Sequence, residues 1–345
     1  QKNLREEASY LMKDIHGGNI WGASKDLKKS PGEILDFSAS INPLGLSQKA
    51  GRAVRRSLGL VPPYPDPDST ELKQALSAYY SVAVDEIIPA NGSTQLIYLL
   101  PEVLRPARAL IVEPAFSEYA SALKLSGCAI DHLPLKERDG FALDLKRLAG
   151  KLEKGIYGLV YIASPANPTG VATGKEALVQ AASICLRAGA TLVVDEAFAD
   201  FADEASITKE APSLSNVIVL RSLTKFFSMA GLRLGFMVSN RRTIKAFAAH
   251  MPPWSVNTLA SCAAIASLKD NAYRRATMMW LSSERPQLFE RLKTIPGLVP
   301  FPSDANFFLV KIAAPGITAP ALKARLLDDG IMIRDLSSFR GLGKS

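Results

Sequence analysis

The chain has 345 residues, 48% hydrophobic and 21% charged, which excludes an intrinsically disordered protein and is typical of one large domain with a smaller one. No apolar run could span a bilayer, the charged first 14 residues lack a signal-peptide core, and the three scattered cysteines show no metal or redox spacing, so we expect a cytoplasmic protein without a metal. The net charge of +8 comes from scattered basic residues without a recognised motif, so we expect no nucleic-acid partner.

Short apolar runs alternate with helical patterns along the first 255 residues. Helices are expected over 71–80, where Ser69 or Thr70 could provide the cap, over 95–104, and over 174–188, where Gly189 ends the helix. The uninterrupted apolar runs suit strands covered on both faces; they are 109–112, 159–162, 191–194 and 217–220. This alternation predicts an α/β fold in which helices sandwich a mainly parallel sheet.

The pattern changes after about Trp254. We expect a helical region over 259–294 that contains Pro286, a strand over 305–311, a helix over 319–329 and a strand over 331–334. These elements predict a smaller α+β domain. The domain organisation expected is an N-terminal arm over 1–40 that joins the small domain, a large domain over 41–255 and a small domain over 256–345.

The motif Asn91-Gly92-Ser93-Thr94 precedes the helix expected over 95–104. Glycine allows backbone to approach a ligand, and N–H groups at a helix N-terminus favour phosphate. Ordinary capping by Ser93 or Thr94 is the simpler interpretation of this motif when it is considered alone.

Three further residues follow predicted strands. Phe116, after 109–112, could stack on a flat cofactor or be an ordinary core phenylalanine. Asn167, in Asn-Pro-Thr-Gly after 159–162, could belong to a plain proline turn, and Asp195, after 191–194, could bind water, a metal or a helix end. Ligand crevices of open α/β sheets also form at such strand ends, so a shared ligand site is the functional alternative.

A lysine, Lys225, lies just past the strand expected over 217–220. Ser222 is three residues before it and Arg233 is eight residues after it. A lysine amine can form a Schiff base with an aldehyde, and hydroxyl and guanidinium groups can hold a phosphate. Pyridoxal 5′-phosphate (PLP) offers both an aldehyde and a phosphate.

These motifs occur in the order and rough spacing of fold-type I PLP enzymes, the class I/II aminotransferase superfamily, which the chain resembles over nearly its whole length. Within that group the chain is similar to the histidinol-phosphate aminotransferase branch. It resembles still more the threonine-phosphate decarboxylases of cobalamin biosynthesis. The segments that carry this closer resemblance are 16–19, which begins His-Gly-Gly, 36–45, 195–198 and 334–339.

The resemblance implies an aspartate aminotransferase-like fold and PLP as cofactor. Lys225 would bind the cofactor covalently, Asp195 would pair with its ring nitrogen and Asn167 would hydrogen-bond its ring hydroxyl. Phe116 and Ala197 would pack on the two ring faces. The cofactor phosphate would be held by Gly92, Ser93, Thr94, Ser222 and Arg233. Tyr64, in a proline-rich loop, would reach the phosphate bound by a neighbouring subunit, which implies a homodimer with shared active sites.

The resemblance also implies a small phosphorylated amino-acid substrate whose anionic groups contact His16, Asn42 and Arg334. Related aminotransferases usually carry tyrosine at position 198, and Phe198 removes that hydroxyl. We therefore expect decarboxylation of O-phospho-L-threonine to aminopropanol phosphate. The alternative is an aminotransferase acting on histidinol phosphate or a related amino substrate. Because the family normally carries a further arginine on a later strand, we expect the small domain to be incomplete at Ser345.

Overall fold

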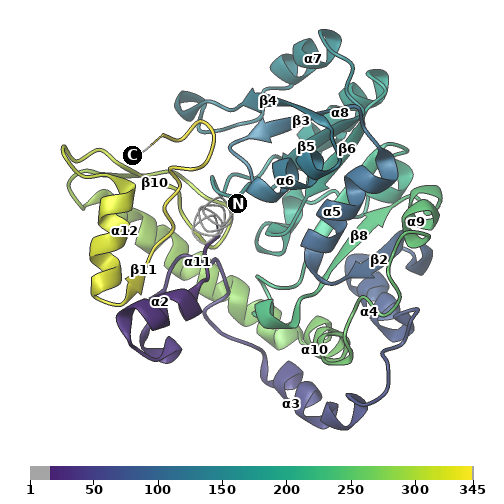
Figure 1. The fold of residues 1–345 in the computed structure, drawn as a ribbon, viewed down its shortest axis with the longest axis horizontal. Helices are drawn as coiled ribbons and strands as arrows, with labels where there is room; N and C mark the ends of the chain where they lie inside the picture. Colours follow the sequence, from purple (N-terminus) through teal and green to yellow (C-terminus); the bar gives the residue numbers. More distant parts are fainter. Residues whose placement is uncertain (1–15, 344–345) are drawn as a thin grey trace, which may run out of the picture.

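The computed structural model describes residues 16–343, and a seven-stranded sheet forms the centre of its large domain (Figure 1). The strand order is β2-β8-β7-β6-β5-β3-β4. Their bounds are β2 Ile87–Ala90, β3 Arg108–Glu113, β4 Ala129–Pro134, β5 Leu159–Ala163, β6 Thr191–Asp195, β7 Val217–Ser222 and β8 Gly235–Ser239. All neighbours pair in parallel except β8, which is antiparallel to both β2 and β7. The predicted α/β fold with a mainly parallel sheet is confirmed.

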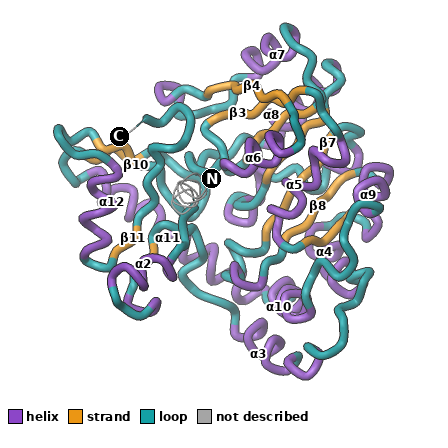
Figure 2. Tube along the Cα trace, viewed as in Figure 1, coloured by secondary structure: helices purple, strands orange, loops and turns teal. Residues whose placement is uncertain are grey.

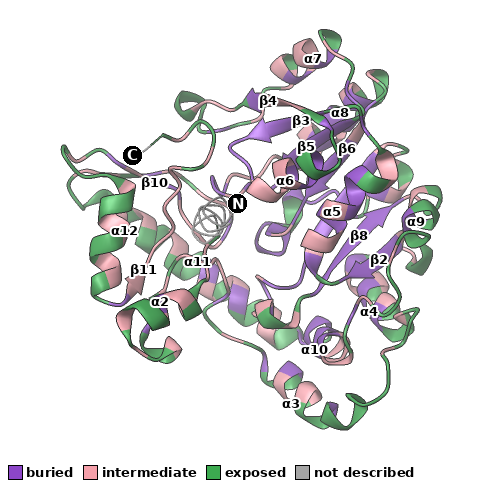
Figure 3. Cartoon of the chain, in the orientation of Figure 1, coloured by how far each residue is buried: buried purple, intermediate pink, exposed green. Residues whose placement is uncertain are grey.

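Both faces of this sheet are covered, as the uninterrupted apolar runs predicted. In β6, Val194 belongs to one buried apolar cluster and Val193 to another, because successive side chains of a strand point to opposite faces. Figure 3 shows the central strands as buried and the outer surfaces of the surrounding helices as largely exposed. The sheet therefore forms a rigid support for the loops at its edges.

The helices form two layers, one on each face of the sheet, because different helices contribute side chains to the two buried clusters. The cluster on one face includes side chains from α5 (Gly92–Leu104), α6 (Ser117–Leu125) and α9 (Arg241–Ala248). The cluster on the other face includes side chains from α3 (Gln48–Arg56), α4 (Thr70–Tyr80), α7 (Leu145–Glu153), α8 (Lys175–Arg187) and α10 (Thr258–Leu268). Figure 2 shows the strands of the sheet with helices around them.

The small domain combines segments from both ends of the described chain. Strand β1 (Leu35–Asp36) pairs in parallel with β11 (Ile331–Met332), and β9 (Leu298–Pro300) pairs antiparallel with β10 (Val310–Ile312). Figure 1 shows α2 (Ile20–Leu27) next to α12 (Ala319–Asp328), and the long helix α11 (Asn271–Lys293) runs from this domain toward the large one. Within residues 16–343, no helix has both the length and the apolarity needed to cross a bilayer.

The structure refines one local prediction and corrects two others. Ser69 has a left-handed backbone and makes no capping bond, and the Asp66 carboxylate accepts from the Thr70 N–H at 2.7 Å instead. The helical region predicted over 259–294 is confirmed and consists of two helices, since Asp270 caps α11, and Pro286 lies within α11. The strand expected over 305–311 is restricted to β10, because the loop before it bonds to the large domain, with the Asp304 N–H donating to the Gly170 carbonyl at 2.8 Å.

Candidate active site

A pocket opens where the carboxyl ends of β5, β6 and β7 meet the N-terminus of α5. All the predicted cofactor residues except Tyr64 line it, together with Phe198. The lining residues are Gly92, Ser93, Thr94, Phe116, Tyr119, Ala163, Pro165, Asn167, Asp195, Ala197, Phe198, Ser222, Thr224, Lys225 and Arg233. Parallel strands bring these residues together because their carboxyl ends share one edge of the sheet.

One end of the pocket is suited to an anion. Helix α5 begins at Gly92, whose φ of +74° is readily adopted by glycine, and a Cβ there would lie 2.6 Å from the Arg233 guanidinium. The first N–H groups of a helix lack intrahelical partners and attract negative charge. Ser93 and Thr94 lie inside α5 rather than at its cap, so the simple capping interpretation is wrong.

Two hydroxyls complete this end. The Ser222 and Thr224 side chains hydrogen-bond each other at 2.7 Å, and both line the pocket. Thr224 was missed by the sequence analysis, although it lies immediately before Lys225. Hydroxyl, guanidinium and helix N–H groups together form a donor set that fits a phosphate.

Lys225 also lines the pocket. Burial lowers its pKa, the neighbouring Arg233 lowers it further, and Asp195 opposes both effects. Its Nζ lies 5.9 Å from the centre of the Phe198 ring. A lysine with a lowered pKa keeps more of its amine unprotonated at neutral pH, and this form is the nucleophile.

The Asp195 carboxylate is buried and fixed by two hydrogen bonds. One oxygen accepts from the Ala197 N–H at 2.9 Å and the other from the Tyr119 hydroxyl at 2.6 Å. Burial raises the pKa of Asp195, and these two donors oppose the rise by stabilising the charged form. Tyr119 was also missed, although it lies on the first turn of α6, directly after the N-cap residue Phe116 and its neighbours, and the ring centres of Phe116 and Tyr119 are 5.9 Å apart.

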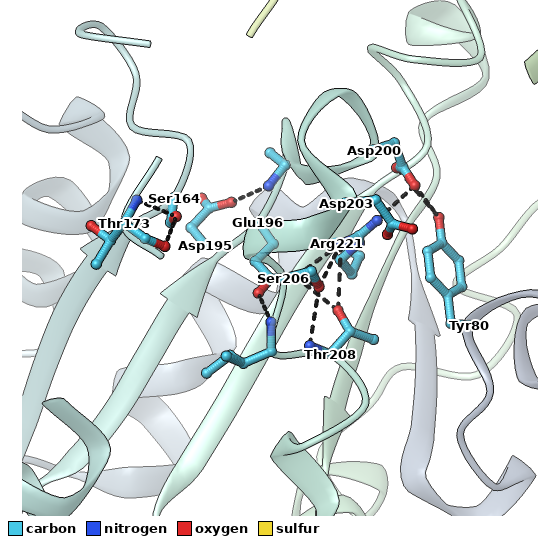
Figure 4. Close-up of polar contacts among 12 residues, drawn as sticks. Tyr80, Ser164, Thr173, Asp195, Glu196, Asp200, Asp203, Ser206, Thr208 and Arg221 are labelled. Atoms are coloured by element: carbon cyan, nitrogen blue, oxygen red, sulfur yellow. Dashed lines mark hydrogen bonds and ion pairs between the residues drawn. The ribbon is translucent and has the colours of Figure 1, made fainter. Parts of the chain in front are cut away.

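Asn167 lies on a loop whose base is closed by paired hydrogen bonds (Figure 4). The Ser164 hydroxyl donates to the Thr173 carbonyl at 3.2 Å and accepts from the Thr173 N–H at 2.9 Å. The small domain also contacts this loop, because the Asp304 carboxylate accepts from the Ala172 N–H at 2.8 Å. Asn167 lines the pocket, so its motif is more than a plain turn.

The structure does not bring Asn42 into the pocket. Its side chain is 1% exposed, and its amide nitrogen lies within hydrogen-bond distance of the Phe226 carbonyl and of the Tyr273 and Thr277 hydroxyls. These buried contacts use both amide N–H groups. In this structure these contacts tie the start of the large domain to α11, and the substrate contact expected of Asn42 stays a prediction.

Three other predicted residues lie outside the pocket lining. Tyr64 is 78% exposed and stacks on Trp254, with 4.5 Å between the ring centres. Arg334 lies over the Phe339 ring at 5.8 Å. His16 is nearest to the pocket: its ring centre is 5.5 Å from that of Phe116, and its Nε2 is 2.9 Å from a Glu118 oxygen.

Comparison with known proteins decides the family. The family model described as aminotransferase class I and II matches residues 32–343. The chain belongs to the class I and II aminotransferase family. It is 37% identical to the threonine-phosphate decarboxylase of Salmonella typhimurium over 337 residues, which cover 96% of this chain and 90% of that protein.

Solved structures of this family agree with the fold. The histidinol-phosphate aminotransferase from Clostridium acetobutylicum has a TM-score of 0.82 and 29% identity, covering 90% of this chain and 92% of that one. Aspartate aminotransferase from Thermus thermophilus has a TM-score of 0.77 and 21% identity, covering 94% and 90%. The expected aspartate aminotransferase-like fold is confirmed.

This aminotransferase-family chain is a PLP-dependent enzyme, and the pocket fits that cofactor. Lys225 offers an amine for the aldehyde, and Asp195 offers a carboxylate for the ring nitrogen. The N-terminus of α5, with Arg233 and the hydroxyls beside it, offers an anion site for the phosphate. The individual roles of these residues remain predictions.

The Tyr119 hydroxyl leads to a prediction about pH. In the Tyr119→Phe variant, Asp195 loses a donor that stabilises its charged form, so its pKa should rise further. PLP binding that depends on the ionised carboxylate is lost as the pH falls through that pKa, so the loss should begin at a higher pH than in the parent. In the acidic pH range where binding is being lost, we expect the variant to bind PLP roughly tenfold or more weakly than the parent. The reason is that a hydrogen bond to a charged group contributes about 1.5–3 kcal/mol.

Equilibrium dialysis of PLP across a pH series measures this shift. Tyr161→Phe is the matched control, because Tyr161 stacks on Tyr119 at 4.8 Å, whereas its buried hydroxyl has no partner among residues 16–343. An acid limb that moves equally in both variants would contradict the role assigned to the Tyr119 hydroxyl.

Proposed function

We propose that this enzyme decarboxylates O-phospho-L-threonine to aminopropanol phosphate and carbon dioxide, a step of cobalamin biosynthesis. The similarity to the Salmonella typhimurium decarboxylase over 96% of the chain supports this substrate. The observation that carries the choice of reaction is Phe198, which lines the pocket beside Lys225 and packs its ring against Phe307 at 5.0 Å. No hydroxyl is present at the position where related aminotransferases usually have one.

Bound in this pocket, PLP supplies the electron sink that allows one bond at the substrate Cα to break. The bond that breaks depends on how the protein orients the substrate, and cationic groups set that orientation. His16, placed against Phe116 at the edge of the pocket, is a predicted contact for an anionic group of the substrate. The Lys225 side chain, whose pKa is lowered, would take up a proton as the free amine and, as the ammonium, return that proton to Cα after carbon dioxide leaves.

The decisive experiment is to mix the PLP-loaded enzyme with O-phospho-L-threonine and follow both gas and cofactor. We expect release of carbon dioxide while the cofactor remains in its aldehyde form. L-Threonine without the phosphate is the control and should react far more slowly. Conversion of the cofactor to pyridoxamine phosphate without carbon dioxide would contradict the decarboxylase and support the alternative, which histidinol phosphate with 2-oxoglutarate then tests.

We also propose a homodimer with shared active sites. Tyr64 does not line the pocket of its own chain and instead stacks on Trp254, and the nearby side chains Leu58, Leu60 and Val61 are each more than half exposed. Such an exposed apolar patch on a large domain is typical of a protein–protein interface. A second copy of the chain would cover this patch and bring Tyr64 to the phosphate site.

Sedimentation equilibrium tests the dimer, with an expected mass of twice the 37.2 kDa of one chain. Replacing Val61 by aspartate should weaken the association, because a charge would be buried in the interface. Lys154→Asp, on the surface beyond α7, is the control and should leave the mass unchanged. A monomeric parent protein that binds PLP fully would contradict the shared site.

A further inference from the structure

A group of buried charged side chains lies beside the cofactor pocket without lining it (Figure 4). The Arg221 side chain is fully buried, and its guanidinium donates to Glu196 at 2.8 Å and to Asp200 at 2.6 Å. Glu196, also fully buried, accepts from the hydroxyls of Ser206 at 2.5 Å and Thr208 at 2.8 Å. One cation and two carboxylates are thus removed from water together.

Stability alone does not account for this group. Burying charges has a large desolvation cost, and replacing a buried ion pair by well-packed apolar side chains is often neutral or stabilising. What a hydrogen-bonded buried network does provide is a preferred arrangement of the segments that it joins, and both terminal nitrogens of Arg221 have partners here, although its Nε has none among residues 16–343. The position of the group in the fold shows which segments these are.

Arg221 and Glu196 are each adjacent in sequence to a residue of the pocket. Asp195 ends β6 and Ser222 ends β7, and both line the pocket. Glu196 directly follows Asp195, and Arg221 directly precedes Ser222. Because side chains alternate along an extended chain, Glu196 and Arg221 point to the side opposite to these pocket residues. The ion pair between them therefore joins the two strand ends from behind the pocket.

Backbone hydrogen bonds alone hold these two strand ends together less firmly than backbone bonds and the ion pair do together. The ladder between β6 and β7 pairs Asp195 with Leu220, and the Glu196 N–H donates to the Leu220 carbonyl at 2.8 Å. Beyond this bond the strand ends are linked by the bridge from Arg221 to Glu196. Without the bridge, the ends carrying Asp195 and Ser222 could shift relative to each other.

A second contact fixes Arg221 from another side. Asp200, in the 3-10 turn Ala199–Phe201, accepts from the Tyr80 hydroxyl at 3.1 Å, and the Tyr80 ring lies 4.7 Å from the Arg221 guanidinium carbon. Tyr80 is the last residue of α4. The guanidinium is therefore held by helix α4 and the turn after β6, as well as by Glu196.

We propose that Arg221 and Glu196 are positioning residues for the cofactor. Their ion pair sets the placement of Asp195, assigned to the cofactor ring nitrogen, relative to Ser222 and Lys225, assigned to its phosphate and aldehyde. A cofactor that spans both strand ends is bound tightly only when their separation is fixed. This inference rests on PLP binding and does not depend on whether the reaction is decarboxylation or transamination.

The test measures binding and spectrum rather than turnover. Glu196→Gln keeps the shape of the side chain and can still accept hydrogen bonds, but it removes the charge that holds Arg221. We expect the dissociation constant for PLP to rise on the order of tenfold, as when an outer partner of a bound group is removed. The pH midpoint of the visible band of the bound cofactor should move as well, because Asp195 is displaced from the ring nitrogen.

Arg221→Lys is the second variant, because it keeps the charge but cannot bridge Glu196 and Asp200 at once, and we expect it too to weaken PLP binding. Ser239→Ala is the control: its buried hydroxyl donates to the Val217 carbonyl at 2.6 Å, at the opposite end of β7. This control should lower the urea midpoint of unfolding but leave the dissociation constant and the band unchanged.

The proposal is overturned if either network variant folds and keeps both the parent dissociation constant and the parent band midpoint. It is also overturned if Ser239→Ala changes these two values as much as the network variants do, since the effect would then be general loss of stability. These outcomes remain distinguishable from failure of the proposed reaction, because no amino-acid substrate is present. A parent protein that bound no PLP would instead contradict the cofactor assignment.

Discussion

Replacing Lys225 by alanine is expected to abolish the visible absorbance of bound PLP and to slow turnover by at least about 10³-fold. Among residues 16–343, Lys225 is the only lysine that lines the pocket, and burial lowers the pKa of its amine. The variant loses both the covalent attachment of the cofactor and a positioned acid–base group, which alone contributes about 10²–10⁴-fold. Absorbance spectra of the PLP-loaded protein and rates with O-phospho-L-threonine measure the two effects.

Two further variants distinguish the amine from its charge. Lys225→Arg keeps a cation, but a guanidinium does not deprotonate at working pH, so this variant should also lack the band. Lys269→Ala removes an exposed lysine at the end of α10 and should keep the parent band and rate. If Lys225→Ala retained the band, the covalent attachment would have to lie elsewhere.

The large domain was predictable because its strands are buried on both faces. The run 191–194 contains only apolar and β-branched residues, and it became β6 with Asp195 as its last residue. A strand of this kind can be predicted from its own residues, because an uninterrupted apolar run suits burial on both faces. The segment 305–311 is different, because Asp304 and its neighbours bond to the large domain, and this contact depends on residues more than a hundred positions away.

The pocket residues were predictable where a polar or charged side chain follows a predicted strand, as at Asn167, Asp195 and Lys225. The pattern could not give the direction of a side chain within a loop. Asn42 therefore proved to be buried against α11, although its motif resembled a substrate-binding one. Tyr119 was missed because its role depends on reaching Asp195, which is 76 positions away in the chain.

The burial of Arg221 could not be predicted from the sequence either, because it depends on residues distant in the chain. A charged residue at the end of an apolar run would normally be expected to reach solvent. It is buried because Glu196 and Asp200, 25 and 21 positions earlier, supply carboxylates at the same depth. Only the paired strands β6 and β7 reveal that these charges meet.

Arg221→Met is expected to lower the free energy of unfolding by about 3–5 kcal/mol, because it leaves two buried carboxylates without their cation. That loss is a large share of the roughly 5–15 kcal/mol that stabilises a folded domain. Urea unfolding of the PLP-free protein, followed by circular dichroism, measures the loss without the stabilisation that bound cofactor adds.

The stability lost in Arg221→Met should depend on pH, because the variant leaves the Asp200 carboxylate buried without the Arg221 cation. Burial raises the pKa of Asp200, and Arg221 opposes that rise, so removing Arg221 should raise this pKa further. The folded variant then binds a proton more tightly than the unfolded chain, and its stability falls as the pH rises above the unfolded value of about 4. The deficit relative to the parent should therefore be smaller in acid than at neutral pH.

Neutralising the carboxylates as well provides the control that separates charge from shape. In the triple variant Arg221→Met, Glu196→Gln, Asp200→Asn no ionised group remains in the network, so most of the lost stability should return even though the guanidinium is still absent. The triple variant should also lose the pH dependence of the single one. If it were no more stable than Arg221→Met, the cost would come from lost packing against Tyr80 rather than from uncompensated charge, and the electrostatic account of this network would be wrong.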